Sequence, residues 1–268
     1  MPAPENRFKA ALAQGRAQMG AWVGLADPYA AEITASAGFD WLLIDGEHAP
    51  NDLRSIMAQL RVVGASGSHA VVRLPMDETW AIKQALDIGA QSILIPLVES
   101  AAQAERLVRA PRYAPRGNRG VGAALARASG FSAVPDYLAT ADDQIWLGVQ
   151  VETRAGLAAL DDILTVEGVD GVFIGPADLA ADMGFGADSH AAPVVAAIRD
   201  AIRRIAASGK APGILTTDPA FARQCLDDGA RFVATCIDVT TYAAAIRAAG
   251  QAARALRDAV PPEPGSGE

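Results

Sequence analysis

The sequence of 268 residues is poor in cysteine and in lysine, and both shortages narrow its chemistry. Its only cysteines are Cys225 and Cys236, whose spacing fits neither a disulfide framework nor a CxxC metal or redox motif. We expect both to be reduced packing residues. The only lysines are Lys9, Lys83 and Lys210, and none stands inside or at the carboxyl end of an apolar segment. A buried Schiff-base lysine is therefore not expected.

The sequence is also short of positive charge and of long apolar segments. Its 23 Lys and Arg against 31 Asp and Glu give a net charge of −8, which argues against nucleic acid as a partner, because phosphate binding needs clustered basic residues. No segment approaches the roughly 18 apolar residues of a membrane span, and the first residues lack the apolar stretch of a secretory signal. We therefore expect a cytoplasmic protein without a membrane partner.

Glycine-rich phosphate-binding sequences are missing as well. Neither GxGxxG nor a P-loop sequence occurs. The segments TTDPAFA (216–222) and DVTTYA (238–243), which follow the last two predicted strands, contain no glycine. A phosphorylated substrate is therefore disfavoured.

What the sequence does contain is a regular alternation of strand-like and helical segments. Between most of the strand-like segments lie alanine-rich stretches with helical spacing, and this alternation predicts a parallel sheet. Eight such units favour a closed (β/α)8 TIM barrel of the α/β class over an open doubly wound sheet. We expect residues 1–258 to form this single domain and residues 259–268 to form a tail. The predicted strands are 20–26, 41–45, 69–75, 92–98, 145–152, 171–175, 211–216 and 231–237.

The connections of this predicted barrel have two notable features. Gly38, Gly89, Gly168 and Gly229 each precede a strand, where glycine can take the left-handed conformation that ends a helix. Two connections are longer than a barrel needs, 114–143 after the fourth strand and 181–190 after the sixth. Long connections at the carboxyl face typically form lids or substrate walls, whereas the alternatives are surface elaboration or a subunit contact.

Two carboxylates stand just past neighbouring apolar strands. Glu152 follows WLGVQV (146–151), and Asp178 follows VFIGPA (172–177). Anionic oxygens from adjacent strands, completed by water and a bidentate ligand, suit an octahedral divalent cation such as Mg²⁺, Mn²⁺ or Co²⁺. The alternatives are a salt bridge from Glu152 to Arg154 or another arginine, and a helix-capping role for Asp178.

The segment IGPADL (174–179) predicts a tight turn followed by a short helix. The first backbone N–H groups of such a helix have no partners within it, so they can bind a carboxylate beside the proposed cation. A small α-keto acid could then chelate the metal through its keto and carboxylate oxygens.

Arg73 emerges at the end of the strand sequence HAVVR (69–73) rather than on a solvated helix. A guanidinium there supplies a permanent charge and a two-pronged donor for an enolate or carboxylate oxygen. The alternative is a structural pair with Asp45 or Glu47 of the neighbouring strand.

His48 lies in IDGEH (44–48), three residues after Asp45. An imidazole can move protons at neutral pH if a carboxylate fixes its tautomer. Asp45 is one candidate for that carboxylate, and Asp87 of a neighbouring subunit is another. The alternative for His48 is a surface or capping role.

These motifs resemble the HpcH/HpaI aldolase family, the class II pyruvate aldolases that include 4-hydroxy-2-oxoheptanedioate aldolase. The similarity runs from about Phe8 to Ala253. Several of the matching segments are long, which makes chance a poor explanation. They are LLIDGEHAPND (42–52), VVRLP (71–75), RYAPRGNRGVG (112–122), ALARAS (124–129), VQVETRAGL (149–157), VEGVDGVFIGPADLAADMG (166–184) and SGKAPGIL (208–215).

The resemblance implies an assembly and a set of ligands. It implies a barrel whose last helix is exchanged between subunits, in a homo-hexamer built as a trimer of dimers. It places Mg²⁺, Mn²⁺ or Co²⁺ at Glu152 and Asp178. It also implies a small-molecule keto acid and an aldehyde as the reacting partners.

The resemblance further assigns roles to residues around the cation. His48 would transfer protons, supported by Asp45 and, across a subunit boundary, by Asp87. Besides Arg73, the pyruvate-type donor would contact Gln150, Gly175, Pro176, Ala177 and Asp178. The apolar walls for the donor methyl group and the acceptor aldehyde would be Trp22, Val121, Phe173 and Leu215.

The function that these observations favour is a metal-dependent class II aldolase. Such an enzyme reversibly cleaves a 4-hydroxy-2-oxo acid to pyruvate, or a close analogue such as hydroxypyruvate, and an aldehyde. One alternative is an acyl-CoA lyase of the malyl-CoA or citrate lyase type, which shares the enolate chemistry but needs a surface for the nucleotide. The other is a non-catalytic metal-binding barrel.

Overall fold

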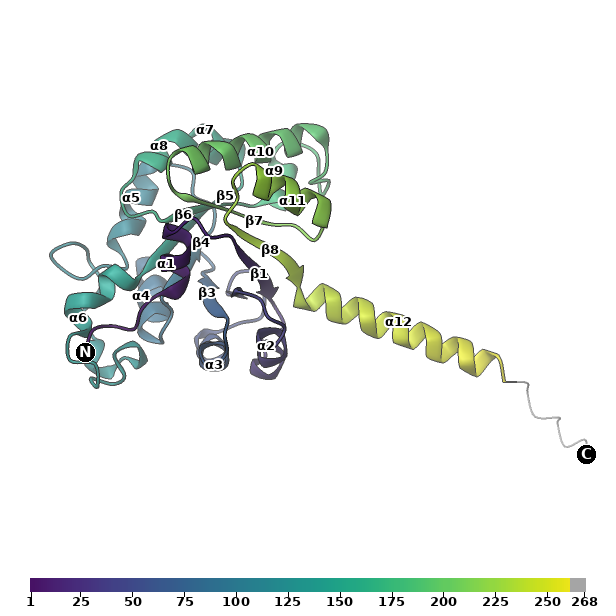
Figure 1. The fold of residues 1–268 in the computed structure, drawn as a ribbon, viewed down its shortest axis with the longest axis horizontal. Helices are drawn as coiled ribbons and strands as arrows, with labels where there is room; N and C mark the ends of the chain where they lie inside the picture. The colour runs from purple at the N-terminus through teal and green to yellow at the C-terminus, as the bar shows by residue number, and fades with distance from the viewer. Residues whose placement is uncertain (261–268) are drawn as a thin grey trace, which may run out of the picture.

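The structure is a computed structural model that describes residues 1–260, and its strands close into one parallel barrel (Figure 1). Neighbouring strands pair in chain order, and the last pairs back to the first. The predicted TIM barrel is therefore confirmed. Of the predicted tail at 259–268, residues 261–268 lie outside the described residues. The strands are β1 (Gln18–Val23), β2 (Trp41–Asp45), β3 (His69–Arg73), β4 (Ser92–Ile95), β5 (Trp146–Val151), β6 (Gly171–Ile174), β7 (Ala211–Leu215) and β8 (Phe232–Ile237).

Helices connect the strands and surround the barrel. Where glycine was expected to end a helix, Gly38, Gly89, Gly168 and Gly229 all have positive φ, between 87° and 113°, which confirms that prediction. The α-helices are α1 (Arg7–Ala13), α2 (Pro28–Ala35), α3 (Leu53–Gly64), α4 (Thr79–Asp87), α5 (Ala101–Arg109), α6 (Tyr137–Thr140), α7 (Arg154–Ala158), α8 (Leu160–Thr165), α9 (Pro176–Asp182), α10 (Ala192–Ala207), α11 (Pro219–Asp227) and α12 (Asp238–Asp258). Short 3₁₀ helices are η1 (Ala123–Leu125), η2 (Arg127–Ser129) and η3 (Ala141–Gln144).

Inward side chains fill the lower part of the barrel with aromatic rings. Trp146 and Phe232 pack edge to face with their centroids 5.2 Å apart, and Trp41 lies 5.8 Å from Phe232. Bare glycines make room for these rings, since a side chain on Gly213 would overlap the ring of Phe232. Because side chains alternate along a strand, the same inward rows carry different groups at the carboxyl ends.

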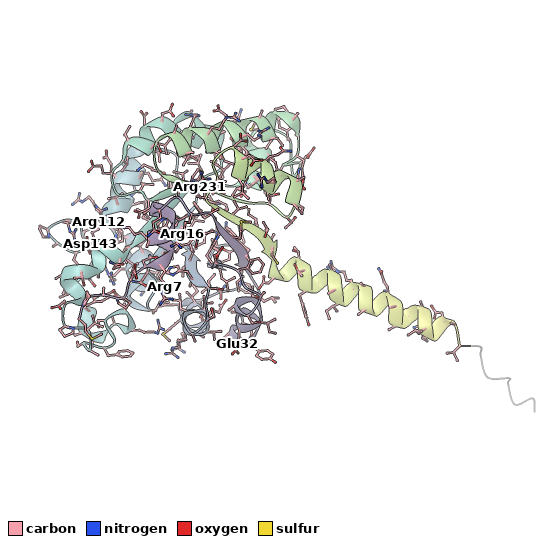
Figure 2. All side chains as sticks on the ribbon, viewed as in Figure 1. Arg7, Arg16, Glu32, Arg112, Asp143 and Arg231 are labelled. Atoms are coloured by element: carbon pink, nitrogen blue, oxygen red, sulfur yellow. The ribbon has the colours of Figure 1, made fainter. Side chains whose placement is uncertain are left out.

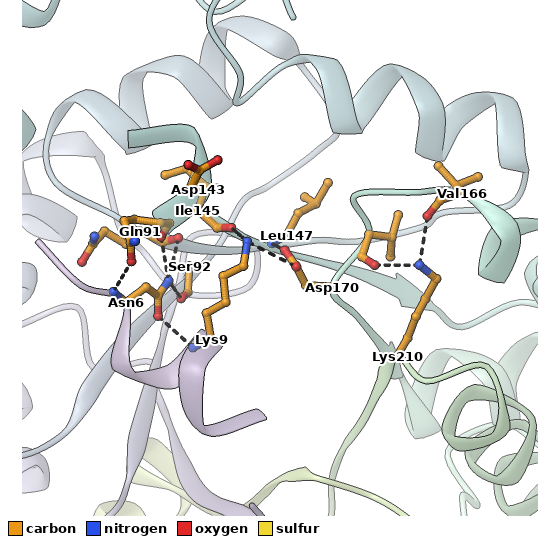
Figure 3. Close-up of polar contacts among 12 residues, drawn as sticks. Asn6, Lys9, Gln91, Ser92, Asp143, Ile145, Leu147, Val166, Asp170 and Lys210 are labelled. Carbon is orange, nitrogen blue, oxygen red and sulfur yellow. Dashed lines mark hydrogen bonds and ion pairs between the residues drawn. The ribbon is translucent and has the colours of Figure 1, made fainter. Parts of the chain in front are cut away.

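Helix α1 closes the amino end of the barrel. Its Phe8 is buried against Trp146, at a centroid distance of 5.1 Å. Asn6 caps the helix by accepting from Lys9 N at 2.9 Å, and its amide donates to Ser92 Oγ at 3.0 Å (Figure 3). Lys9 Nζ lies 3.4 Å from the carboxylate of Asp170. Helix α1 thus covers the amino end of the barrel interior, and barrels of this kind bind their ligands at the carboxyl end.

The long segment 114–143 lies at the amino end, so the prediction that it forms a lid at the carboxyl face of its own barrel is wrong. Helix α5 lies between β4 and this segment and has already returned the chain to the amino ends of the strands. Contacts with α4 confirm the placement, because Arg119 Nη2 donates to Asp87 Oδ1 at 2.8 Å and Arg127 donates to the carbonyl of Ile88 at 3.1 Å.

Helix α12 extends away from the barrel (Figure 1), and its side chains project free of the barrel along most of its length (Figure 2). Asp238, its first residue, is the one buried residue of this helix. Tyr242, Ile246 and Leu256 are 59%, 54% and 74% exposed. Among residues 1–260, no helix is long and apolar enough to cross a membrane.

Candidate active site

The carboxyl ends of the strands bring polar side chains together above the aromatic layers. Asp45 and Arg73 end β2 and β3 and are direct neighbours in the parallel register. Gln150 is paired with Phe173 in the register of β5 and β6, and Glu152 follows β5. All five residues are buried. Parallel strands end on one side of a barrel, so groups from distant segments meet at one mouth.

Arg73 lies in a buried network of hydrogen bonds and ion pairs. Its Nε and Nη2 donate to the two carboxylate oxygens of Asp45 at 2.9 and 2.6 Å, and its Nη1 lies 2.8 Å from Glu47 Oε2. The guanidinium also lies over the ring of Trp22, at 4.9 Å from the centroid. The pairing that was the structural alternative for Arg73 is therefore present. It fixes the guanidinium at the mouth rather than removing it.

Asp45 is the anchor of this network. Besides Arg73, its carboxylate accepts from Trp22 Nε1 at 3.1 Å and from the backbone N–H of Glu47 at 2.9 Å. Burial by itself would raise the pKa of Asp45, but the Arg73 guanidinium and these N–H donors outweigh burial and lower the pKa. Asp45 is thus held as an anion that orients Arg73 and the turn after β2.

His48 is directed differently from the sequence-based expectation. Its imidazole is 65% exposed, and its Nε2 lies 3.8 Å from Glu47 Oε2. Asp45 accepts from the backbone N–H of His48 at 3.3 Å, while its carboxylate oxygens are engaged by Arg73 and Trp22. Asp45 therefore fixes the backbone at His48, and its role toward the imidazole stays a prediction. The carboxylate beside the ring belongs to Glu47.

Glu47 was expected only as a possible structural partner of Arg73, and the structure places it between the guanidinium and the imidazole. It contacts both Arg73 and His48 and is only 14% exposed. Burial raises the pKa of Glu47; the positive charges of Arg73 and His48 act against this rise, and the negative charges of Asp45 and Asp178 add to it. The signal in the sequence was an acidic residue directly beside the proposed proton-transfer histidine.

Glu152 is held on three sides. Its Oε1 accepts from the backbone N–H of Leu97 at 2.9 Å, and its Oε2 accepts from the amide of Gln150. On the third side lies Gly175, where an added Cβ would overlap the Glu152 side chain. Burial raises the pKa of Glu152, and the charges of Asp178 and Glu47 raise it further. The proposed salt bridge to Arg154 is absent, since Arg154 pairs with Asp182 at 3.2 Å.

Asp178 lies in the first turn of α9, the helix that follows β6, and β6 pairs with β5, the strand that Glu152 follows. Its side chain is exposed, and α9 has no side-chain cap, so the alternative role of Asp178 as a helix cap is not realised. The N–H groups of Ala177 and Asp178 belong to the first turn after Pro176, where a helix offers no acceptors of its own. This is the geometry that the sequence predicted for a carboxylate-binding turn.

The electrostatics of this mouth suit a divalent cation. After burial, which is the larger cause, the negative charge of Asp178 raises the pKa of both Glu47 and Glu152. Gln150 Oε1 is buried and has no hydrogen-bond partner in the described residues. A cation near Glu152 and Asp178 would relieve both conditions. Within residues 1–260, no group of three or more His, Cys, Asp and Glu residues is arranged to hold a metal ion.

The predicted apolar walls separate into two groups. Trp22 and Phe173 are buried with their ring centroids 5.5 Å apart, and Leu215 packs against the same cluster. Val121 is 69% exposed in the segment at the amino end, and Asp87 ends α4 nearby. Neither of the latter two meets the mouth of its own chain, so their roles stay predictions that depend on a neighbouring chain.

Comparison with known proteins places this geometry in a family. Residues 18–245 match the model of the HpcH/HpaI aldolase/citrate lyase family. The chain is 62% identical over 247 residues to a hydroxypyruvate/pyruvate aldolase from Roseovarius nubinhibens, covering 92% of this chain and 96% of that one. It is 51% identical over 258 residues to a 4-hydroxy-2-oxo-heptane-1,7-dioate aldolase from Escherichia coli, covering 96% and 98% of the two chains.

The fold agrees with these matches. A crystal structure of a family protein from Burkholderia cenocepacia superposes with a TM-score of 0.88 at 39% identity, covering 93% of this chain and 99% of that chain. The residues that meet at the barrel mouth lie within the matched region. The chain therefore belongs to the HpcH/HpaI aldolase/citrate lyase family and is a carbon–carbon lyase of the aldolase type.

Proposed function

We propose that this chain is a metal-dependent class II aldolase that reversibly cleaves a 4-hydroxy-2-oxo acid to pyruvate, or hydroxypyruvate, and an aldehyde. The observation that carries the proposal is one mouth holding both a buried guanidinium, Arg73, and a buried carboxylate with a raised pKa, Glu152. Glu47 links the two, because it pairs with Arg73 and its charge acts on Glu152. The names of the relatives from Roseovarius nubinhibens and Escherichia coli support the same reaction class.

Glu152 and Asp178 would hold the divalent cation, which we propose to be Mg²⁺, Mn²⁺ or Co²⁺. Gln150 Oε1 is buried and has no hydrogen-bond partner in the described residues, so a nearby cation would also stabilise this oxygen. When bound, such a cation acts as a Lewis acid that polarises the keto group of the substrate. Oxygen ligands of this kind suit these ions, whereas a thiolate zinc site is disfavoured because neither Cys225 nor Cys236 is part of the mouth.

The residues around this pair would bind and orient the keto acid. The N–H groups of Ala177 and Asp178 would hold its carboxylate, and Arg73 would donate to the oxygen on which negative charge develops. Trp22 and Phe173 would shield the donor methyl group from water. The substrate is less charged before the reaction than in the enolate, so the fixed positive groups act most strongly in the transition state.

His48 would move protons at the donor carbon and at the aldol oxygen. Its exposed ring can exchange protons with solvent, and Glu47 Oε2 lies 3.8 Å from its Nε2. The structure pairs this ring with Glu47 in its own chain. Asp87 of a neighbouring subunit remains a proposed second support.

The chain would work as a homo-hexamer, a trimer of dimers in which α12 is exchanged between subunits. The exposed apolar side chains Tyr242 and Ile246 on a helix that leaves its own barrel support such an exchange. An exposed apolar pair on α2, Tyr29 and Ile33, offers part of a surface that a second chain could cover. Analytical ultracentrifugation tests this proposal, and we expect a mass of six chains.

Chelation tests the proposed function directly. After treatment with EDTA, the protein should lose both retro-aldol turnover and deuterium exchange at C3 of pyruvate, because both require enolate formation. Addition of Mn²⁺, Mg²⁺ or Co²⁺ should restore both activities. Undiminished exchange in EDTA would refute the metal dependence. Competition by CoA thioesters but not by keto acids would instead favour the acyl-CoA lyase alternative.

A His48→Ala variant should lose about 100-fold in turnover, near the lower end of the range for general acid–base catalysis. The loss is moderate because the imidazole is 65% exposed, so water can reach the same position and replace it in part. Affinity for Mn²⁺ should stay near that of the unchanged protein, since His48 is not a proposed ligand. A large loss of Mn²⁺ affinity with little loss of turnover would contradict this role for His48.

A further inference from the structure

Leu97 adopts a backbone conformation that its side chain does not favour. Its φ is +54°, in the left-handed region that glycine adopts readily and that is unfavourable for leucine. Ala26, Phe131 and Ser132 also have positive φ, but it is Leu97 whose backbone contacts Glu152. Strained residues of this kind persist where the surrounding contacts fix them, and they concentrate at functional sites.

Packing of the Leu97 side chain does not explain the strain. The side chain is 52% exposed, so little burial is gained in return. Hydrogen bonds of the backbone compensate for the unfavourable conformation, because the N–H groups of two consecutive residues point toward β5 and the residue after it. Leu97 N donates to Glu152 Oε1 at 2.9 Å, and Val98 N donates to the Gln150 carbonyl at 2.9 Å.

A second contact holds the turn from the other side. The amide of Gln103, in α5, donates to the carbonyl of Leu97 at 3.1 Å and to Asp77 Oδ2 at 3.1 Å. Its oxygen accepts from the backbone N–H of Glu99 at 2.9 Å. The loop after β4 is thereby tied to the loop after β3, and Leu97 cannot leave the left-handed conformation without breaking these bonds.

We propose that Leu97 is a positioning residue for Glu152. Its left-handed backbone holds one N–H against Oε1, so that the carboxylate is clamped between this N–H and the amide of Gln150. The inference rests on the proposed function, because a fixed carboxylate matters here as a ligand for the divalent cation. Partners that orient a metal ligand typically change metal affinity by about 10-fold to 100-fold when they are removed.

Four substitutions separate the effect of the Leu97 backbone conformation on Mn²⁺ affinity from the effect of its side chain. Leu97→Val keeps an apolar side chain but branches at Cβ, for which the left-handed region is an outlier. Leu97→Gly and Leu97→Asn lose the apolar side chain but tolerate this region. Leu138→Val, at an exposed leucine of α6, is the matched control. We expect the valine variant at Leu97 to bind Mn²⁺ about 10-fold to 100-fold more weakly, and the other three to bind it like the unchanged protein.

The measurement is titration of the metal-free protein with Mn²⁺ alone, followed by the electron paramagnetic resonance signal of the free ion. Native affinity in Leu97→Val, or equal losses in the glycine and valine variants, would overturn the inference. If Leu97→Val does not fold, Gln103→Ala tests the same turn with Leu97 intact, and native affinity there overturns it. Failure of the unchanged protein to bind Mn²⁺ would instead refute the proposed function itself.

Discussion

An Arg73→Ala variant should lose about 1,000-fold in retro-aldol turnover, the upper range for removing a preorganised donor to a developing oxyanion. Exchange of deuterium into C3 of pyruvate should fall by the same factor, because one enolate serves both reactions. The expectation follows from the geometry, in which Asp45 and Glu47 hold the guanidinium at 2.6–2.9 Å and so fix its donors at the mouth. Exchange that persists at the native rate would contradict this role.

The same substitution should also destabilise the fold. Removing one partner of a buried ion pair costs about 3–5 kcal/mol, because Asp45, which is buried, and Glu47, which is partly buried, are left without their cationic partner. Arg73→Lys separates the two effects, since it keeps the charge but not the two-pronged geometry. We expect it to melt close to the unchanged protein and still to be about 100-fold less active. Arg154→Ala is the matched control, because that arginine is 72% exposed and pairs with Asp182.

The barrel and most of the mouth could be predicted from the sequence because strand ends are a strong constraint. Once eight apolar segments are taken as parallel strands, Arg73, Gln150 and Glu152 must share one end. Alternation along β5 then places Gln150 and Glu152 on one face, and the structure shows their side chains in contact. The alternation of side chains along a strand thus predicts which residues lie together in space.

The turn after β2 shows where that information stops. Beyond Asp45 the strand has ended, so alternation no longer says which side chain points inward. The carboxylate of Asp45 accepts hydrogen bonds from the backbone N–H groups of Glu47 and His48. The resulting turn places the Glu47 side chain against Arg73 and leaves the His48 side chain exposed. The sequence therefore identified the correct segment but not the carboxylate that lies beside the imidazole.

Two further features were missed for different reasons. The lid prediction for 114–143 failed because the helix at 101–109 reverses the chain first, so the segment starts from the amino side. The left-handed backbone at Leu97 has no sequence signal at all, since the residue is neither glycine nor asparagine. It exists only because tertiary contacts to Glu152 and Gln103 outweigh the local preference.

A Glu152→Gln variant should lose about 1,000-fold or more in turnover, since Lewis-acid stabilisation is worth several kcal/mol and each 1.36 kcal/mol is a factor of ten. Glutamine keeps the shape of the side chain and can still accept from the N–H of Leu97. It removes the charge that, with Asp178, would hold the cation, so Mn²⁺ binding should be lost together with the activity. Glu32→Gln, on the exposed face of α2 (Figure 2), is the control.

The stability of this variant should move in the opposite direction to its activity. The pKa of Glu152 is raised in the folded chain, so the folded state binds its proton more tightly than the unfolded state does, and ionisation costs stability as pH rises through the folded pKa. Without metal, Glu152→Gln should therefore resist urea better than the unchanged protein at pH 8, with the difference shrinking toward pH 4. Added Mn²⁺ should stabilise only the unchanged protein. A glutamine variant that is less stable than the unchanged protein at pH 8 would mean that Glu152 stabilises the fold. A more stable variant without activity would mean that the charge of Glu152 is retained for catalysis although it destabilises the fold.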